Sequence, residues 1–380
     1  MKIAFLYTIG RLRRAEKVAQ GIAPTDFFYG SEELRAKGHE IALFEIPEQP
    51  QRSLASRLIE TIGNLGIFRA RLPMKVTGKQ LAQTREIAEA VSQFDVVVVA
   101  GTGTAFAMDI WRFLGRVKCP VVGIHCGFLN ISYTPSRRWI TSFLLNRTWT
   151  MLFGDGEYQP LIDLFGVNPE RVYVNQCGTD THFWTPGNGD GGGDYVLAVG
   201  NDGRRDYDVL MQAAARCQVP FMVVTTRTIK ETIPPNVKIV AGHLWTEILT
   251  DVELRDLFRK AKCVVTPLVE TKQPSGQSVC LQAMACGRPA ILTRTEGLWS
   301  ERIMRDDENV LLVPPYDPEA LSTAIHRIFA DARLEARLGQ AGRESVCREL
   351  TMEHYAERLE EFIQTRVLSL EKRTATAPVS

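Results

Sequence analysis

The sequence lacks the features that mark a membrane-spanning, secreted or metal-binding protein. No apolar run approaches the roughly 20 residues that a membrane-spanning helix needs, and the opening MKIAFLYTIG is better explained as a first β-strand than as a signal peptide. The eight cysteines are scattered, without a CxxC pair, so we expect reduced thiols and no zinc site. The sequence therefore predicts a cytoplasmic protein with no metal and no cofactor.

Charge of one sign is also scarce. The formal net charge is only +1, so the molecule as a whole is not suited to bind a polyanion, and we predict no nucleic-acid partner. Asp206–Tyr207–Asp208 has the DxD form of some metal sites. Three-residue matches are frequent by chance, however, and acidic residues at a helix start interact favourably with the helix dipole. We therefore interpret this segment as the start of a helix.

A complete dinucleotide-binding glycine pattern is missing as well. The pattern GxGxxG should follow a first strand, and neither YTIGRLRRA (7–15) nor AVGNDGRRD (198–206) supplies it. Gly101–Thr102–Gly103 gives only half of the pattern and follows a strand in the middle of its domain. An oxidoreductase is therefore the less favoured alternative.

What the sequence does contain is an alternation of apolar runs and helical patterns. Near-continuous apolar runs are typical of parallel strands that are covered on both faces. In the first half they are KIAFLYT, EIALFEI, DVVVVAG, CPVVGIH and RVYVNQ, and in the second YVLAVG, PFMVVTT, VKIVAG, CVVTPL, PAILTR and VLLVPP. Among the helix candidates is 25–38, with Thr25 or Asp26 as its cap and Gly38 as its stop.

A glycine-rich run separates the two sets of strands. Residues 185–194, TPGNGDGGGD, carry no large apolar side chain and resemble a linker. We therefore expect an α/β protein of two Rossmann-like, doubly wound domains, with ligands at the carboxyl ends of the strands in a cleft between them. The predicted parts are a first domain 1–185, a linker 186–194, a second domain 195–350, a helix 351–370 that packs back on the first domain, and a flexible tail 371–380.

The segment 273–291, QPSGQSVCLQAMACGRPAI, is the most informative part of the chain. A strand runs into a polar loop and then a helix, whose first turn presents free backbone N–H groups and the positive end of the dipole. Such a helix start is a ready phosphate site. Gly276 allows close approach of the backbone, and we expect Ser275, Gly276, Gln277 and Ser278 to line the site. Gln282 lies further along the same helix.

The same segment resembles the donor site of glycosyltransferase family 4, the retaining enzymes of the GT-B fold. RVYVNQCGTDTHFWTP (171–186), YVLAVGNDGRRDYDVLMQAA (195–214), ENVLLVPPYDPEALSTAI (308–325) and YGSEELRAKGHEI (29–41) are similar to further segments of that family, in the same order. The resemblance implies a GT-B fold of two facing domains. It also implies a glycosyltransferase that moves a hexose, with retention, from a nucleotide-sugar to a glycan, lipid-linked or small-molecule acceptor, without a metal.

The resemblance also implies roles for individual residues. Arg205 stands where the family grips the donor diphosphate, with Arg204 as its neighbour. His125 matches a histidine that touches the donor sugar, and Gly242, His243 and Leu244 border the nucleobase.

Two departures from the family concern acidic residues. Position 282 is Gln where the family has a ribose-binding Glu, and the sugar-contacting Glu has no direct match because Pro274 stands eight positions earlier. Glu270 is our candidate substitute. A catalytically inactive sugar-nucleotide-binding relative is the alternative that these departures leave open.

A basic amphipathic stretch lies at 52–79. Its cations are Arg52, Arg57, Arg69, Arg71, Lys75 and Lys79, and its apolar residues are Leu54, Leu58, Ile59, Ile62 and Phe68. This pattern indicates either a peripheral contact with an anionic membrane, at its inner face, or helices that pack on their own domain.

Overall fold

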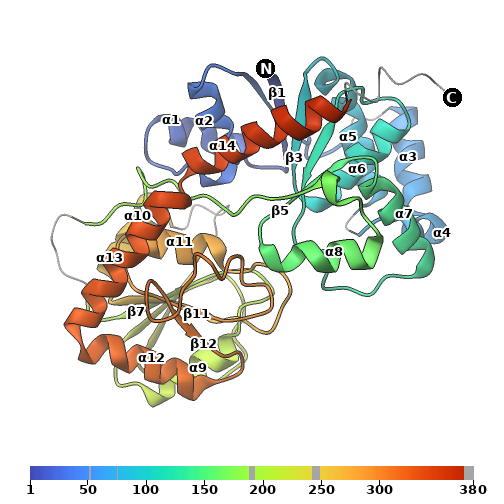
Figure 1. The fold of residues 1–380 in the computed structure, drawn as a ribbon. Coiled ribbons are helices and arrows are strands. Elements are labelled where there is room, and N and C mark those ends of the chain that lie inside the picture. Colours follow the sequence, from blue (N-terminus) through green and yellow to red (C-terminus); the bar gives the residue numbers. More distant parts are fainter. Residues whose placement is uncertain (51–52, 75, 188–192, 242–248, 372–380) are drawn as a thin grey trace. The chain divides into compact units, whose positions relative to one another are not determined.

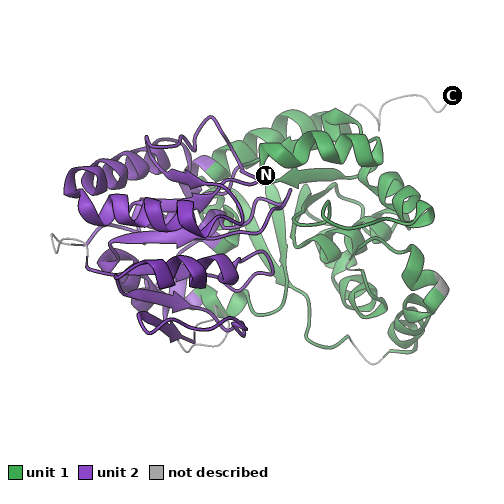
Figure 2. Cartoon of the chain, turned by 90° about the horizontal axis from the view of Figure 1, so that it is seen from below, with its two compact units in different colours: residues 1–15, 27–175, 355–380 green, residues 16–26, 176–354 purple. Residues whose placement is uncertain are grey.

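The computed structural model describes residues 1–380 except 51–52, 75, 188–192, 242–248 and 372–380. Most of the predicted linker, nearly all of the predicted tail, and the predicted nucleobase border Gly242–His243–Leu244 therefore lie outside the described residues. The chain forms two compact units (Figure 2). Unit 1 comprises residues 1–15, 27–175 and 355–380, and unit 2 comprises residues 16–26 and 176–354.

Unit 1 contains a parallel sheet of six strands in the order β2-β1-β3-β4-β5-β6. The five strands predicted for the first half are confirmed. A sixth, β5, was not predicted because its four residues WTML lack the long Val/Ile run of its neighbours. The strands are β1 (Lys2–Tyr7), β2 (Glu40–Glu45), β3 (Val96–Ala100), β4 (Val121–Ile124), β5 (Trp149–Leu152) and β6 (Val172–Val174).

The helices of unit 1 pack on this sheet or on one another (Figure 1). They are α2 (Ser31–Ala36), α3 (Leu54–Asn64), α4 (Gly66–Arg71), α5 (Gly78–Val91), α6 (Thr102–Phe113), α7 (Pro135–Leu145), α8 (Tyr158–Phe165) and most of α14 (Met352–Phe362). The C-terminal helix α14 is held in unit 1 by side-chain contacts: the rings of Tyr173 and Phe362 stack at 4.6 Å. Within the residues that the structure describes, no helix combines the length and the apolar character needed to cross a membrane.

Unit 2 contains a second parallel sheet of six strands, in the order β12-β11-β10-β7-β8-β9. All six strands predicted for the second half are confirmed. They are β7 (Val196–Val199), β8 (Phe221–Val224), β9 (Val237–Val240), β10 (Cys263–Thr266), β11 (Ala290–Thr293) and β12 (Leu311–Val313). The order reverses between β7 and β10, and the crevice at such a reversal is where open α/β sheets bind ligands.

Helices cover both faces of this second sheet, as the apolar strands predict. Alternate residues of one strand enter different cores: Val264 packs in the core under α11, whereas Val265 packs in the core under α9. The helices are α9 (Tyr207–Arg216), α10 (Asp251–Lys260), α11 (Gln277–Ala285), α12 (Pro318–Ala330) and α13 (Ala332–Glu349). A short helix, α1 (Ala15–Ala19), opens the segment 16–26, which also belongs to unit 2.

The helix predicted over 25–38 is wrong in its first half. The structure has a single 3-10 turn at Asp26–Phe28 and a separate helix α2 from Ser31. Tyr29 and Gly30 have positive φ angles of 50° and 83°, which no right-handed helix allows. Asp26 is not a helix cap; its carboxylate is buried in unit 2. The predicted stop is correct, since Gly38 has a φ of 89° just beyond α2.

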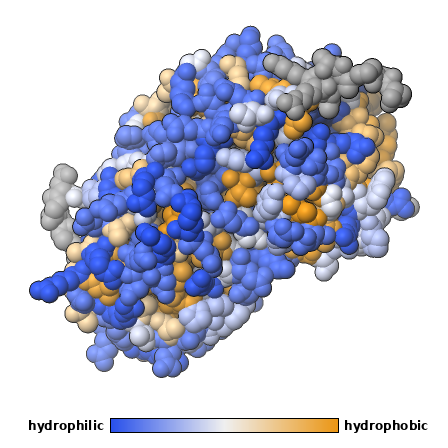
Figure 3. All heavy atoms as spheres, viewed as in Figure 1, coloured by the Kyte–Doolittle hydropathy of each residue, from blue (hydrophilic) through white to orange (hydrophobic). Residues whose placement is uncertain are grey.

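Helix α3 turns its apolar face away from its own unit. It packs on α5 through small residues: a β-carbon at Gly63 would lie 2.6 Å from Cα of Gly78. Its leucines point outward, with Leu54 86% exposed and Leu58 60% exposed. We call these residues, with Ile62, Leu65 and Phe68, the α3–α4 surface. In Figure 3 hydrophobic side chains reach the surface near the position at which Figure 1 places α3.

Candidate donor site

The loops that follow β7 and β10 meet at the strand-order reversal of unit 2. They are joined by backbone hydrogen bonds, from Asp206 N to Pro267 O at 3.1 Å and from Val269 N to Arg204 O at 3.0 Å. Arg205 and Leu268 form an isolated β-bridge between the same two loops. This pairing fixes the backbone of the predicted diphosphate-binding arginine against the segment that leads into α11.

The guanidinium of Arg205 is buried in this crevice, with only 4% of its side chain exposed. It lies across Gly200, where a β-carbon would come 1.9 Å from Nε. Nε donates a hydrogen bond to Val199 O at 3.2 Å, and Nη1 lies 3.4 Å from Oδ2 of Asp202. Nη1 makes no hydrogen bond with any described residue. A buried cation with a spare donor favours an anionic ligand.

The N-terminus of α11 lies beside this guanidinium. Gly276 is the N-cap, with a φ of 79°, and no side chain caps the helix. A β-carbon at Gly276 would lie 3.1 Å from Nη1 of Arg205. The hydroxyl of Ser275 is buried, without a hydrogen-bond partner among the described residues. The structure thus brings together the helix start that the sequence predicted as a phosphate site and the arginine to which the family resemblance gave a diphosphate contact.

Of the described residues in unit 2, the other predicted donor ligands lie in the same two loops or in α11. Gln277 is buried, whereas Ser278 and Arg204 are half-buried. Glu270 is exposed, and its Oε1 accepts hydrogen bonds from the N–H groups of Thr271 and Glu296, both at 2.9 Å. Glu270 therefore holds two loops together in this structure, and its predicted contact with a sugar stays a prediction.

Gln282 is only 5% exposed, and its side chain contacts another residue of unit 2. Its Nε2 donates a hydrogen bond to Oδ2 of Asp26, at 3.1 Å. Burial raises the pKa of the Asp26 carboxyl to about 6, although hydrogen bonds from Asp180, Gln282 and Trp184 oppose the increase. The ribose contact predicted for Gln282 stays a prediction.

The DxD-like segment has the helix-start role that the sequence favoured. Asp206 is the N-cap of α9, and its Oδ1 accepts a hydrogen bond from Val209 N at 3.0 Å. Asp208 lies in the first turn and accepts a hydrogen bond from Gln212 on the same helix, at 3.0 Å. Partial burial raises the pKa of Asp206 above its ordinary value. Both carboxylates thus have structural partners within α9.

His125 belongs to unit 1, where it follows β4. Its ring is fully buried, with centroid distances of 4.7 Å to Phe106 and 5.4 Å to Phe128. Neither ring nitrogen has a hydrogen-bond partner among the described residues. Burial lowers the pKa of His125 to about 3, so the imidazole is neutral at neutral pH. Direct contact with a sugar would require the ring to leave this aromatic environment.

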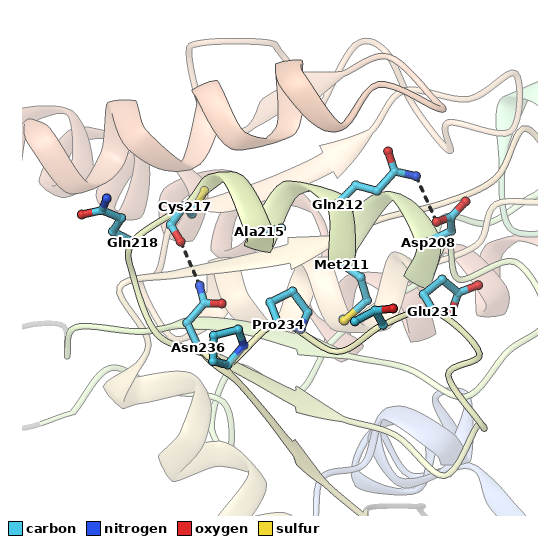
Figure 4. A pocket seen from close by; sticks show the side chains of 11 residues that line it. Asp208, Met211, Gln212, Ala215, Cys217, Gln218, Glu231, Pro234 and Asn236 are labelled. Carbon is cyan, nitrogen blue, oxygen red and sulfur yellow. Dashed lines mark hydrogen bonds between the residues drawn. The ribbon is translucent and has the colours of Figure 1, made fainter.

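A pocket of about 760 Å³ lies elsewhere in unit 2, beside α9 (Figure 4). Met211 and Ala215 of α9 line one side, and Glu231, Pro234 and Asn236 line the other. None of the described residues that form it is a predicted donor ligand. The candidate donor site is therefore defined by the polar groups around Arg205 and not by this pocket.

Sequence reasoning missed Gly200 and Asp26. Gly200 directly follows an apolar strand, which is a signal of close approach by another group, and that group is the Arg205 side chain. Asp26 had no comparable signal, because it lies more than 150 residues from the partners of its carboxylate.

Comparisons with known proteins match the part of the chain that contains Arg205 and α11. Residues 193–331 match the family model described as "Glycosyl transferases group 1". A D-inositol 3-phosphate glycosyltransferase of Acidothermus cellulolyticus is 28% identical over 222 residues, which cover 51% of this chain and 47% of that protein. The MMP alpha-(1->4)-mannosyltransferase of Mycolicibacterium hassiacum is 29% identical over 188 residues, covering 47% of this chain and 44% of that protein. The matches thus span about half the length of these relatives.

Solved structures match almost the whole chain. Sucrose-phosphate synthase of Thermosynechococcus elongatus has a TM-score of 0.70 at 18% identity, covering 96% of this chain and 99% of that one. HepE of Anabaena, in complex with UDP-glucose, has a TM-score of 0.67 at 15% identity, covering 96% of this chain and 100% of that one. Residues 193–331 thus carry the group 1 glycosyltransferase pattern, and the chain has the α/β fold of the GT-B glycosyltransferases.

Proposed function

We propose that this chain is a glycosyltransferase that takes a hexose from a nucleoside diphosphate sugar and transfers it, with retention of configuration, to an acceptor hydroxyl. The donor diphosphate lies between Arg205 and the N-terminus of α11. The acceptor is a glycan, a lipid-linked sugar or a small molecule. Both the group 1 family match over 193–331 and the nucleotide-sugar bound to HepE support a donor of this class.

One observation carries the proposal: a buried guanidinium with a free donor next to an uncapped helix start. Burial of a cation is costly unless it is paired and hydrogen-bonded, and the one ion pair of Arg205 within the described residues is with Asp202, at 3.4 Å, whose side chain is 39% exposed. A diphosphate supplies further negative charge and accepts hydrogen bonds from Nη1, from Ser275 Oγ and from N–H groups in the first turn of α11. The location at the strand-order reversal fits the same ligand.

The chemistry needs little more than this arrangement. The bond between C1 of the sugar and the terminal phosphate oxygen breaks, and C1 forms a bond with the acceptor oxygen. The acceptor proton passes to the departing phosphate oxygen, and the nucleoside diphosphate leaves. Negative charge develops on the leaving oxygen, where Arg205 and the α11 dipole lower its energy. The reaction needs no separate general base.

Glu270 and His125 have secondary roles in the proposal. Glu270 stabilises the loop between β10 and α11, because its carboxylate accepts hydrogen bonds from the backbone N–H groups of both Thr271 and Glu296. From there its carboxyl group is the candidate contact for the sugar. His125 is the candidate from unit 1, and its neutral imidazole suits hydrogen bonding to a hydroxyl and not charge stabilisation.

The proposal includes a peripheral membrane contact through 52–79. The α3–α4 surface exposes five large apolar side chains, and Arg57, Arg69 and Arg71 are exposed beside them. Apolar residues that enter the headgroup region, with cations around them, are the pattern of a helix that lies on an anionic bilayer. Such a contact suits a lipid-linked acceptor.

A panel of nucleotides and nucleotide-sugars tests the function. We expect one of UDP, GDP and ADP, with its sugar conjugate, to raise the thermal midpoint, since a ligand at about 100 times its Kd stabilises by roughly 2.7 kcal/mol. Release of free nucleoside diphosphate should follow when an acceptor extract is added. Binding without transfer or hydrolysis would favour the inactive relative, and binding of none of the three would contradict the proposal.

A further inference from the structure

A buried acid from the N-terminal part of the chain lies against the donor-site helix. Residues 16–26 belong to unit 2, although the chain before and after them belongs to unit 1. Asp26 ends this segment and is 6% exposed. Its carboxylate contacts Gln282 of α11, the helix whose first turn borders Arg205.

Among the described residues, every hydrogen-bond partner of this carboxylate is a donor. Oδ1 accepts from Asp180 N, and Oδ2 accepts from Trp184 Nε1 at 2.9 Å and from Gln282 Nε2 at 3.1 Å. The hydroxyl of Thr179 lies 3.4 Å from Oδ2. A carboxylate has enough lone pairs for all four donors, so the site requires an acceptor at position 26 and donors around it.

The segment that carries Asp26 is itself fastened to unit 2. Thr25 N donates to Oδ2 of Asp180 at 3.0 Å, and Oδ1 of Asp180 accepts from His182 N and Phe183 N, both at 3.0 Å. Asp26 is therefore not a side chain that reaches in from a loose loop. These hydrogen bonds hold Asp26 in place, and Asp26 in turn holds the Gln282 side chain of α11.

These contacts explain why position 282 is Gln in this chain. An ionised Glu has no N–H to donate and would place a second carboxylate beside Asp26, in a buried site where two like charges repel strongly. An amide donates to Asp26 and keeps its own oxygen as an acceptor. The residue type at 282 is thus matched to the residue type at 26.

We propose that Asp26 and Gln282 form a positioning pair that holds α11 so that its N-terminus and Arg205 meet the donor diphosphate together. The inference rests on the proposed function of that anion site. It predicts that donor affinity depends on a carboxylate facing an amide, and that two carboxylates facing each other weaken it. If Gln282 only contacted the ribose, Gln282→Glu would change donor affinity by the same factor whether residue 26 is Asp or Asn.

An exchange of the two groups tests the pair. Asp26→Asn, Gln282→Glu and the double variant are compared with the wild type for the Kd of UDP, GDP and ADP, at about pH 8 and well below every thermal midpoint. We expect Gln282→Glu to bind at least tenfold more weakly, and the double variant to recover part of this loss, because the amide introduced at position 26 can donate to the carboxylate introduced at position 282 but leaves Trp184 Nε1 without its acceptor. At about pH 5.5 the single variant should recover in part, because one of its two carboxyls is then protonated.

The chain offers a matched control, the exposed pair Asp208 and Gln212 on α9, which has the same hydrogen bond at 3.0 Å. Asp208→Asn and Gln212→Glu should leave the Kd unchanged. Wild-type affinity in Gln282→Glu, or no recovery in the double variant, would overturn the positioning pair. Failure of the wild type to bind any of the three nucleotides would instead overturn the proposed function, and it would be seen before any variant is made.

Discussion

The guanidinium of Arg205 lies so close to Gly276 that a β-carbon at position 276 would come within 3.1 Å of Nη1. One residue belongs to the loop after β7, and the other is the N-cap of α11. Their proximity joins a buried positive charge to a helix start that no side chain caps, and that combination suits a diphosphate.

Gly276 should tolerate no side chain. Its φ of 79° is unfavourable for L-residues, and a β-carbon would lie 2.4 Å from Cγ2 of Thr266. We expect Gly276→Ala to lower the unfolding free energy by about 1–2 kcal/mol and to weaken nucleotide binding. Gly287→Ala is the control, since Gly287 has a similar φ of 69° at the other end of α11. It should lose stability and keep its nucleotide Kd, measured by calorimetry. If Gly276→Ala and Gly287→Ala lost nucleotide affinity equally, backbone strain alone would explain the effect of Gly276→Ala.

Transfer should not depend on a divalent cation, because Arg205 and α11 already offset the diphosphate charge in this account. The rate of nucleoside diphosphate release should be unchanged in EDTA. Loss of activity in EDTA, restored by magnesium or manganese, would contradict this and reopen the metal-binding interpretation of Asp206 and Asp208.

The α3–α4 surface should bind vesicles that contain phosphatidylglycerol and release them at high salt, since screening weakens the cationic contribution. Replacing Leu54 and Leu58 by Ser should abolish sedimentation with these vesicles. Ile233 and Ile239, exposed apolar residues of unit 2, serve as the matched control pair for replacement by Ser. Equal binding to phosphatidylcholine alone, or binding that survives the Leu54 and Leu58 replacements, would argue against this surface.

Protonation of Asp26 should stabilise the fold as the pH falls. Burial raises the pKa of this carboxyl from 3.8 to about 6. The folded chain therefore binds the proton more tightly than the unfolded chain, and stability from this group increases as the pH falls from above 6 towards 4. We expect the thermal midpoint of wild type, relative to Asp26→Asn, to increase between about pH 7 and about pH 5. A difference that is independent of pH would contradict the buried, titrating carboxyl.

Much of this architecture could be predicted from the sequence, because the strands and loops follow from patterns of neighbouring residues. Eleven of the twelve strands found in the described residues coincide with apolar runs, and Arg205 and Gly276 each occur in a recognisable loop. What the sequence could not predict depends on contacts between distant residues. The bond from Gln282 to Asp26 spans 256 positions, and the aromatic burial of His125 depends on how α6 packs against β4. The split of the helix predicted at 25–38 has the same origin, since tertiary contacts hold Asp26 outside any α-helix.

The most direct test of the account is the nucleotide Kd of Arg205 variants, measured by calorimetry with UDP, GDP and ADP. Loss of one charge-assisted hydrogen bond costs about 1.5–3 kcal/mol, so Arg205→Ala should bind about 10- to 100-fold more weakly. Arg205→Lys should recover only part of the loss, because an ammonium lacks the planar fork of donors. Arg216→Ala, which removes an exposed arginine of α9, should bind like wild type. An unchanged Kd and unchanged release of nucleoside diphosphate in Arg205→Ala would contradict the assignment of the donor site to Arg205 and α11.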